Sequence, residues 1–190
     1  RVPLVVKWPG VTDGQKGRCH AGLHYHVDFG ATLVELLGGK QPETWCGRSF
    51  AETLKSGKHV GREYLVLSQG AWSCQRSVRW DDWIFIRTYD TGLKNFPSLM
   101  LFNLKDDPHE TTNLAAKRPD LVSHGQQRMD EWLAEQLKVS GRPDPLQAVI
   151  AEGGPLHARE TFKALIECLD RTGRGAHARW LEKNGGTPRD

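Results

Sequence analysis

Five residues within one short stretch of the chain have side chains that bind transition metals: Cys19, His20, His24, His26 and Asp28. Thiolates, imidazoles and carboxylates are ligands of zinc in proteins, so a zinc site is one interpretation. Their spacing matches no standard zinc finger. Two other interpretations stay open, namely polar loop residues with a helix cap, or a pocket for an anionic substrate. We assign no metal ligand here and treat His24 and His26 as candidate substrate-binding residues.

Residues 68–76 form a second unusual stretch, which combines small polar side chains with one tryptophan, Trp72. An exposed aromatic ring beside small polar groups suits recognition of a sugar or aryl ring. Arg76 or Arg79 would offer a planar fork to a sulfate or carboxylate. The alternative is a hairpin loop whose Trp72 packs on a neighbouring domain. Cys74 has no base near it in the sequence, which argues against a nucleophile. We therefore predict that Trp72 and Arg76 bind substrate.

Residues 101–115 have the pattern of a strand that runs into a turn and then a helix. Pro108 ends the strand, because proline has no N–H to donate to a ladder. The short side chains of Asp106, Asp107 and Thr111 can accept hydrogen bonds from nearby amides, which favours a turn or a helix cap. From these local interactions alone, we predict that residues 101–115 have a structural role.

Composition narrows the function classes. The chain has 190 residues, of which 38% are hydrophobic and 26% are charged, typical of a folded globular protein. The net charge is +3, and the basic residues are scattered, so a nucleic-acid-binding surface is not indicated. No apolar run approaches the roughly 20 residues that span a bilayer. The four cysteines fit one Cys19–Cys46 disulfide or separate buried thiols.

The elements that must position these residues follow from the apolar pattern. Val2–Trp8 is a continuous apolar run, which predicts a strand buried on both faces. A helix follows from Asp28, with an apolar face at Phe29, Leu33 and Leu36–Leu37. Since a chain that opens at Arg1 directly in a strand lacks the neighbours of that strand, we expect the natural N-terminus to lie upstream.

A β-rich block and three helices follow. The strands are predicted at residues 64–67, 76–80, 83–89 and 99–104. The second and third are separated by two residues, which predicts a tight antiparallel hairpin. The helices are predicted from Pro119 to about residue 137, and at residues 159–171 and 176–183.

Four segments together resemble the C-terminal part of sulfatases. The stretch LFNLKDDPHETTNLA at residues 101–115 resembles their LYDL-x-x-DP-x-E-x-x-NLA segment. RVPLVVKWPG at residues 1–10 resembles the strand R-V-P-x-x-x-x-W-P-G. Residues 26–38 resemble D-x-x-P-T-L-L-x-L-A-G, and residues 76–86 resemble R-x-V-R-x-G-x-x-K-x-I, where Trp83 and its neighbours depart from the pattern. The four occur in the family's order over residues 1 to about 137.

The resemblance also implies what this chain lacks. Sulfatases hydrolyse sulfate esters with a formylglycine made in a Cys/Ser-x-Pro-x-Arg motif, beside a calcium held by Asp and Asn ligands. No such motif occurs in the 190 residues. The family's nucleophile, metal ligands and catalytic lysine precede the matching strand, so no catalytic residue is carried over. Calcium and formylglycine are expected in the complete protein and not in this chain.

The resemblance implies an α/β fold, as an α+β fragment in three parts. Residues 1–60 would hold the last strand and helix of a large mixed α/β sheet. Residues 61–140 would form a small antiparallel four-stranded sheet packed on a long C-terminal helix, and residues 141–190 a helical extension. The chain would supply scaffold and substrate-cleft wall to a sulfatase-like hydrolase. Its expected partners are the upstream catalytic part of the same protein and a sulfated small molecule or glycan, with no nucleic acid and no membrane.

Two rival functions remain. One is a phosphonate or phosphate ester hydrolase of the same alkaline-phosphatase-like superfamily, which the nucleophile motif of the complete protein would distinguish. The other is a non-catalytic module that binds an anionic glycan or serves assembly. That module should fold on its own, whereas the leading hypothesis predicts an exposed apolar surface around Val2–Val6.

Overall fold

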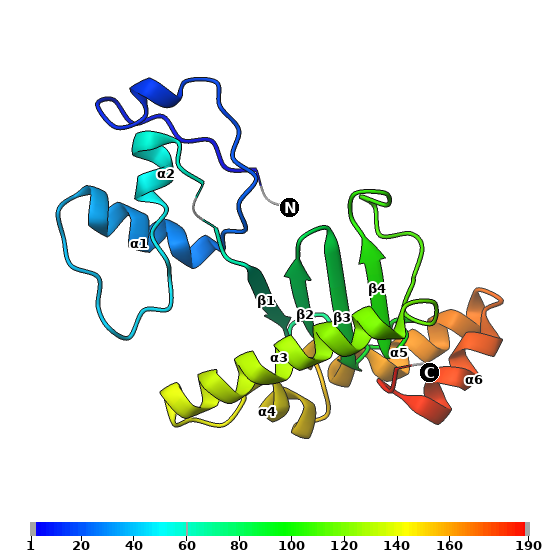
Figure 1. Ribbon diagram of the computed structural model, residues 1–190. Coiled ribbons are helices and arrows are strands. Elements are labelled where there is room, and N and C mark those ends of the chain that lie inside the picture. Colours follow the sequence, from blue (N-terminus) through cyan, green and yellow to red (C-terminus); the bar gives the residue numbers. More distant parts are fainter. Residues whose placement is uncertain (1–2, 60, 189–190) are drawn as a thin grey trace. The chain divides into compact units, whose positions relative to one another are not determined.

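A computed structural model describes residues 3–59 and 61–188 (Figure 1). The chain divides into two compact units, Arg1–Leu65 and Val66–Asp190. The first unit holds η1 (Asp13–Gln15), α1 (His26–Leu36) and α2 (Ala51–Ser56). Strand β1 (Tyr64–Gln69) begins at the end of this unit. The second unit continues with β2 (Cys74–Trp80), β3 (Trp83–Asp90), β4 (Leu99–Asn103), α3 (Pro119–Ser140), α4 (Pro145–Ala151), α5 (Leu156–Arg171) and α6 (Gly175–Asn184).

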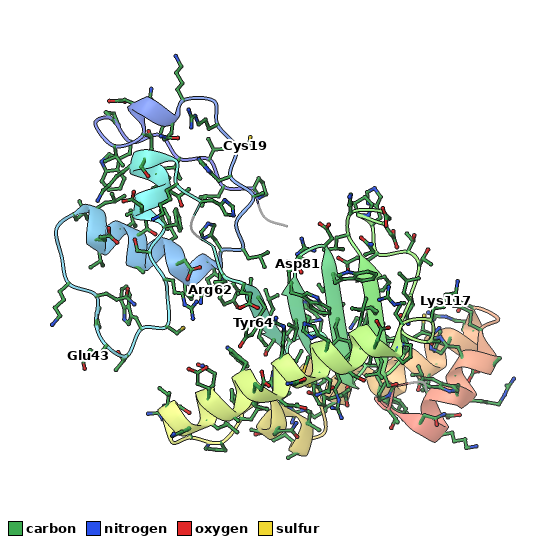
Figure 2. The ribbon with its side chains drawn as sticks, viewed as in Figure 1. Cys19, Glu43, Arg62, Tyr64, Asp81 and Lys117 are labelled. Atoms are coloured by element: carbon green, nitrogen blue, oxygen red, sulfur yellow. The ribbon has the colours of Figure 1, made fainter. Side chains whose placement is uncertain are left out.

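One buried carboxylate holds the first unit together. Asp28 is fully buried, and its carboxylate accepts hydrogen bonds from the backbone N–H groups of Tyr25 at 2.8 Å and Arg48 at 2.7 Å. The guanidinium of Arg62, labelled in Figure 2, pairs with the same carboxylate. Asp28 also completes a capping box at the start of α1. The helix start, the loop before α2 and the end of the unit thus meet at one side chain.

The predicted strand at the start of the chain is absent. Residues 3–8 have no regular secondary structure, and Arg1 and Val2 lie outside the described residues. Leu4 and Val5 are 59% and 92% exposed. A strand buried on both faces needs flanking strands to pair with, and the described part of this unit supplies none.

The apolar face predicted for α1 is only partly covered, since two of its four members are half-buried. The helix buries Asp28, Ala31 and Thr32 instead. Of the predicted face, Phe29 is 42% exposed and Leu37, which directly follows the helix, is 74% exposed. The pattern identified the helix correctly but not its buried side, because within this unit the buried side is fixed by the polar contacts of Asp28.

The second unit is built on the predicted sheet, which has the order β1-β2-β3-β4 (Figure 1). Strands β2 and β3 are antiparallel and pair Trp80 with Trp83, which confirms the two-residue turn. Asp81, at the tip of this hairpin (Figure 2), has a φ of 40°. Asp and Asn tolerate this left-handed conformation better than most residues, so the acidic pair can close the hairpin.

The core of this unit lies between the sheet and α3, which crosses one face of it (Figure 1). Val78, Phe85 and Leu101 are cross-strand neighbours on β2, β3 and β4, and all three are fully buried. Gly125 of α3 sits directly on Phe85, where a Cβ would overlap the Phe85 side chain. Met129, one turn further, is also fully buried. The prediction that the four-stranded sheet packs on a long helix is therefore confirmed.

The segment from β4 to α3 is tied by side-chain hydrogen bonds. The Asp107 carboxylate accepts from the backbone N–H groups of Thr111 and Thr112, both at 2.8 Å. These bonds lower the pKa of Asp107 below its ordinary value. The Asn113 side chain bonds the backbone of β4 at Leu99 and Leu101. The segment that resembles the sulfatase pattern thus serves to turn the chain from the sheet to its covering helix.

Helices α4, α5 and α6 form the C-terminal part. Helix α4 was not predicted; it begins with Asp144, whose side chain caps the N–H of Leu146, and with Pro145 in the first turn. Helices α5 and α6 were predicted and pack on each other around Leu169, Ala178 and Leu181. No helix in the described ranges is long and apolar enough to cross a membrane. The three-part division at residues 60 and 140 stays a prediction.

Candidate functional site

A hollow of about 540 Å³ opens beside Trp72 in the second unit. It is lined by three segments: the β1–β2 loop, the turn after β3, and the first half of α5. Its main lining residues are Trp72, Leu93, Lys94, His157, Thr161 and Leu165. Trp72 is 64% exposed, and its role as a ligand-binding aromatic stays a prediction.

Two nitrogen-bearing side chains flank this tryptophan. The Lys94 ammonium lies 5.7 Å from the centre of the Trp72 ring, within the range of a cation–π contact. The His157 ring centre lies 5.1 Å from that of Trp72, tilted by 53°. Partial burial lowers the pKa of Lys94, while the charge of Asp90 opposes this shift. An exposed aromatic side chain with an ammonium over its ring and an imidazole beside it is suited to bind a sugar that carries negative charge.

The backbone around Lys94 is held in an uncommon conformation. Gly92 and Leu93 both have positive φ, 58° and 66°. A Cβ on Gly92 would overlap the carbonyl oxygen of Trp72, so this close approach requires glycine. A bulky residue such as Leu93 is rarely found in the left-handed region and needs support from its surroundings. That support is visible, because Leu93 packs on the core shared by α5 and α6.

Arg76 is placed differently from the sequence prediction. Its side chain is 3% exposed and forms a two-pronged ion pair with the Asp144 carboxylate, with N–O distances of 2.8 to 3.1 Å. Its Nε donates to Ser68 at 2.9 Å, and its guanidinium lies 5.8 Å from the Trp132 ring centre. The Arg76 guanidinium does bind a carboxylate, but this carboxylate belongs to Asp144 of the same chain. Arg76 therefore has a structural role here, and its guanidinium is not open to a substrate.

The polar residues around Trp72 form an internal network. The Gln69 amide donates to Ser73 at 2.9 Å and to Gln75 at 2.8 Å, and Gln75 donates to Thr88 at 3.0 Å. Cys74 is fully buried, and burial raises the pKa of its thiol. A protonated, inaccessible thiol is not a nucleophile. The small polar side chains thus fix the loop, and Trp72 is the member that reaches solvent.

The two candidate histidines lie in the first unit, whereas Trp72 and Arg76 lie in the second. His24 is half-buried, with its ring centre 4.9 Å from that of Phe50. Burial lowers the pKa of His24; the nearby Asp28 opposes this, while His59 and Arg62 add to it. His26 opens α1, with its ring edge-on to Tyr25 at 4.3 Å. The structure brings neither histidine together with Trp72 or Arg76 within one unit.

The zinc interpretation finds no support in the structure. Among residues 3–59 and 61–188, no three side chains of the types His, Cys, Asp and Glu are placed to hold a metal ion. All four cysteines are free, which also removes the Cys19–Cys46 disulfide; Cys19 (Figure 2) and Cys46 are exposed. Among the described residues, no group of three such side chains is placed to hold a calcium ion either.

Sequence reasoning missed Lys94 and His157. They lie 22 and 85 positions after Trp72, and only the tertiary fold brings them to it. A weak signal did exist for the turn, since Thr91-Gly92 follows a predicted strand. For His157 the sequence offered no signal beyond its place at the start of a helix.

The family model for the C-terminal region of N-sulphoglucosamine sulphohydrolase matches residues 1–138. The chain belongs to this family. Its membership confirms the resemblance to C-terminal sulfatase segments described above. The match ends two residues before the end of α3, so α4, α5 and α6 lie outside the family region, including the half of the Trp72 hollow that α5 provides.

Curated relatives of this family member are much longer proteins. A multifunctional alkaline phosphatase superfamily protein, PehA of Trinickia caryophylli, is 33% identical over 129 residues, covering 60% of this chain and 24% of that protein. A sulfatase of Formosa agariphila is 26% identical over 189 residues, covering 88% and 32%. Arylsulfatase K of Xenopus laevis is 29% identical over 142 residues, covering 70% and 25%. The chain thus spans a quarter to a third of the length of these relatives.

One solved structure is also similar over part of the chain. BT4656, solved in complex with its substrate D-glucosamine-2-N,6-O-disulfate, aligns with 63% of this chain and 25% of its own, at 20% identity and a TM-score of 0.46.

Proposed function

We propose that this chain forms the C-terminal part of a sulfatase-like hydrolase, where it supplies scaffold and substrate-cleft wall while residues outside it perform the chemistry. The observation that carries the proposal is the family match over residues 1–138. It agrees with the absence of a Cys/Ser-x-Pro-x-Arg motif from the 190 residues. The complete protein would hydrolyse sulfate esters of a small molecule or a glycan.

The exposed apolar side chains of the first unit support a protein partner. Leu4, Val5, Phe29, Leu37 and Trp45 are all more than 40% exposed. Single exposed apolar residues are ordinary, but five within 42 positions of one small unit suit a covered face. The upstream catalytic part of the same protein is the partner that the length of the relatives suggests.

The cofactors of the reaction belong to that catalytic part in our proposal. Calcium and formylglycine would be supplied there, because the described residues do not fit a calcium ion and the formylglycine motif is absent. What this chain can add is substrate contact. We propose His24 and His26 from the first unit and Trp72 from the second as such contacts. Replacing either histidine by alanine in the complete protein would raise KM for an anionic substrate and leave kcat unchanged; an unchanged KM would contradict its role.

A related function is favoured by one relative. PehA, the 33% identical protein, is described as a multifunctional member of the alkaline phosphatase superfamily. Phosphonate or phosphate ester hydrolysis is therefore the second candidate. It would place the same scaffold beside a different nucleophile, and it leaves the role of this chain unaltered.

Assaying the complete protein on 4-nitrophenyl sulfate, phosphate and phenylphosphonate, with calcium and with a chelator, decides between the two. We predict that the sulfate ester gives the highest kcat/KM and that the chelator lowers it, since calcium would stabilise charge on the ester oxygens. A higher kcat/KM for the phosphonate would favour the second candidate. Turnover of none of the three esters would contradict both.

A further inference from the structure

The hollow beside Trp72 has the features of a binding site of its own. Its volume of about 540 Å³ lies within the range of roughly 300–1,000 Å³ that small-molecule sites occupy. It is lined by apolar side chains and a few polar groups that converge on one aromatic ring. We propose that the Trp72 hollow binds a sugar ring that carries an anionic group, and that helix α5 completes the site. The proposal rests on the proposed function and adds to it a ligand class and a location.

The aromatic ring provides the surface for the sugar. Trp72 exposes 64% of its surface although the side chains of Leu93 and Leu165 lie at the same hollow. A large apolar ring in this position gains free energy when another flat, partly apolar ring covers it. The apolar face of a pyranose has the matching size and shape.

The charge of the hollow selects for an anion. Lys94 and His157 are its titratable lining residues, and none of its described lining side chains is a carboxylate. The nearby Asp90 directs one oxygen to the backbone N–H of Gly92 at 2.8 Å. Nδ1 of His157 donates to the carbonyl oxygen of Ala71 at 3.1 Å, because a carbonyl oxygen can only accept. The other ring nitrogen, Nε2, is therefore the one that can contact a ligand. The Lys94 ammonium offers a charge-assisted hydrogen bond to a sulfate or a carboxylate, and Nε2 of His157 can accept a hydrogen bond from a sugar hydroxyl.

These groups are ordered before any ligand arrives. The Lys94 ammonium donates to the backbone carbonyl of Trp72, and Gly92 packs on the same carbonyl. Leu93, in its left-handed conformation, is anchored in the core between α5 and α6. Because folding already fixes the turn, the loop and the helix, binding pays little further ordering entropy. The turn holds Leu93 in an uncommon left-handed conformation and places Lys94 beside the exposed Trp72. Uncommon backbone conformations of this kind are found at constrained binding sites.

Helix α5 makes the site specific to proteins that carry this C-terminal segment. His157, Thr161 and Leu165 all come from α5, which lies outside the family region that ends at residue 138. A family member without these helices would have no counterpart of His157 beside the tryptophan. The site therefore distinguishes family members that carry a counterpart of α5 from those that lack one.

Isothermal titration calorimetry on the complete protein, with chelator present to prevent turnover, tests the proposal. The probes are a heparin-derived tetrasaccharide, trigalacturonic acid and neutral cellotriose, which separate sulfate, carboxylate and uncharged sugars. The variants are Trp72→Ala, Trp72→Phe and Lys94→Gln. Val139→Ala is the control, because Val139 is a 79% exposed apolar residue of the same unit that does not line the hollow.

We expect Trp72→Ala to weaken binding of at least one charged probe about tenfold, the loss of one ring contact and its buried area. Trp72→Phe should keep most of the affinity, and Lys94→Gln should weaken charged probes while leaving cellotriose unaltered. No saturable binding of either charged probe, or equal Kd values for Trp72→Ala and Val139→Ala, would overturn the proposal. If the complete protein hydrolyses an ester but its sugar binding does not depend on Trp72, the proposed site is wrong and the proposed function is unaffected. If sugar binding depends on Trp72 but no ester is hydrolysed, the proposed function is wrong and the site is unaffected.

Discussion

At the scale of single residues, the buried carboxylate of Asp28 helps to explain why the first unit is ordered although five of its large apolar side chains are exposed. Burial by itself would raise the pKa of Asp28, but hydrogen bonds from Arg62 and from the Tyr25 and Arg48 amides outweigh burial and hold it below the ordinary value of 3.8. A carboxylate with a lowered pKa stabilises the folded state at pH values above its ordinary pKa of 3.8. The stabilisation is lost as the pH falls toward the lowered pKa.

We predict that Asp28→Asn weakens the first unit by about 3 kcal/mol at neutral pH, because it leaves Arg62 unpaired and sets an amide against backbone donors. Amide hydrogen exchange of residues 25–48 measures this local loss. The difference from wild type should shrink as the pH falls below 3.8 toward the lowered pKa of Asp28, where the folded carboxylate becomes protonated. Glu43→Gln, at an exposed acid (Figure 2), is the control. An effect of Asp28→Asn that does not vary with pH would contradict the role of its charge.

At the scale of elements, the ion pair of Arg76 and Asp144 fastens α4 to β2. Asp144 is the N-cap of α4, and the two residues are 68 positions apart. Both side chains are almost fully buried. Losing one partner would leave the other charged and buried, which costs far more than losing an exposed pair. The C-terminal helices are therefore attached to the sheet and do not follow it as a loose tail.

We predict that Arg76→Met destabilises the second unit by about 3 kcal/mol, and that adding Asp144→Leu recovers much of this loss, since the double variant contains no unpaired buried charge. Urea denaturation followed by circular dichroism gives both values. Arg118→Met is the control, because its pair with Asp120 is exposed. Additive effects of the two substitutions would show that Arg76 and Asp144 are not coupled.

The sequence predicted those elements whose cause is local. All four strands, the hairpin and four of the helices follow from apolar periods and turn residues, and the structure confirms them. The strand at residues 3–8 failed because it needs neighbours that the described residues do not include. Helix α4 was missed although Asp144-Pro145 is a recognisable helix start. The short α2 helix was also missed, in a stretch expected to be a loop.

The candidate site could be predicted only in part, for a similar reason. Trp72 was identified because an exposed aromatic within a polar loop is a local signal. The true partner of Arg76 is an aspartate far along the chain, and Lys94 and His157 reach Trp72 through a strained turn and a distant helix. Long-range contacts of this kind leave no periodic trace in one sequence.

At the scale of the whole molecule, two observations belong together. The chain is a member of a C-terminal sulfatase family, and it spans a quarter to a third of the length of its relatives. Its first unit exposes apolar side chains that an additional domain would cover. Our account is that the chain shapes a cleft and binds part of a substrate, and that another part of the protein carries the nucleophile and its metal.

The most direct test is to compare the isolated 190-residue chain with the complete protein on 4-nitrophenyl sulfate in the presence of calcium. Our account predicts turnover by the complete protein and none by the chain alone, even at high protein concentration. A sizing column and a thermal melt run beside the assay show whether the chain is folded. Sulfate release by the folded, isolated chain would contradict the claim that its residues do not perform the chemistry.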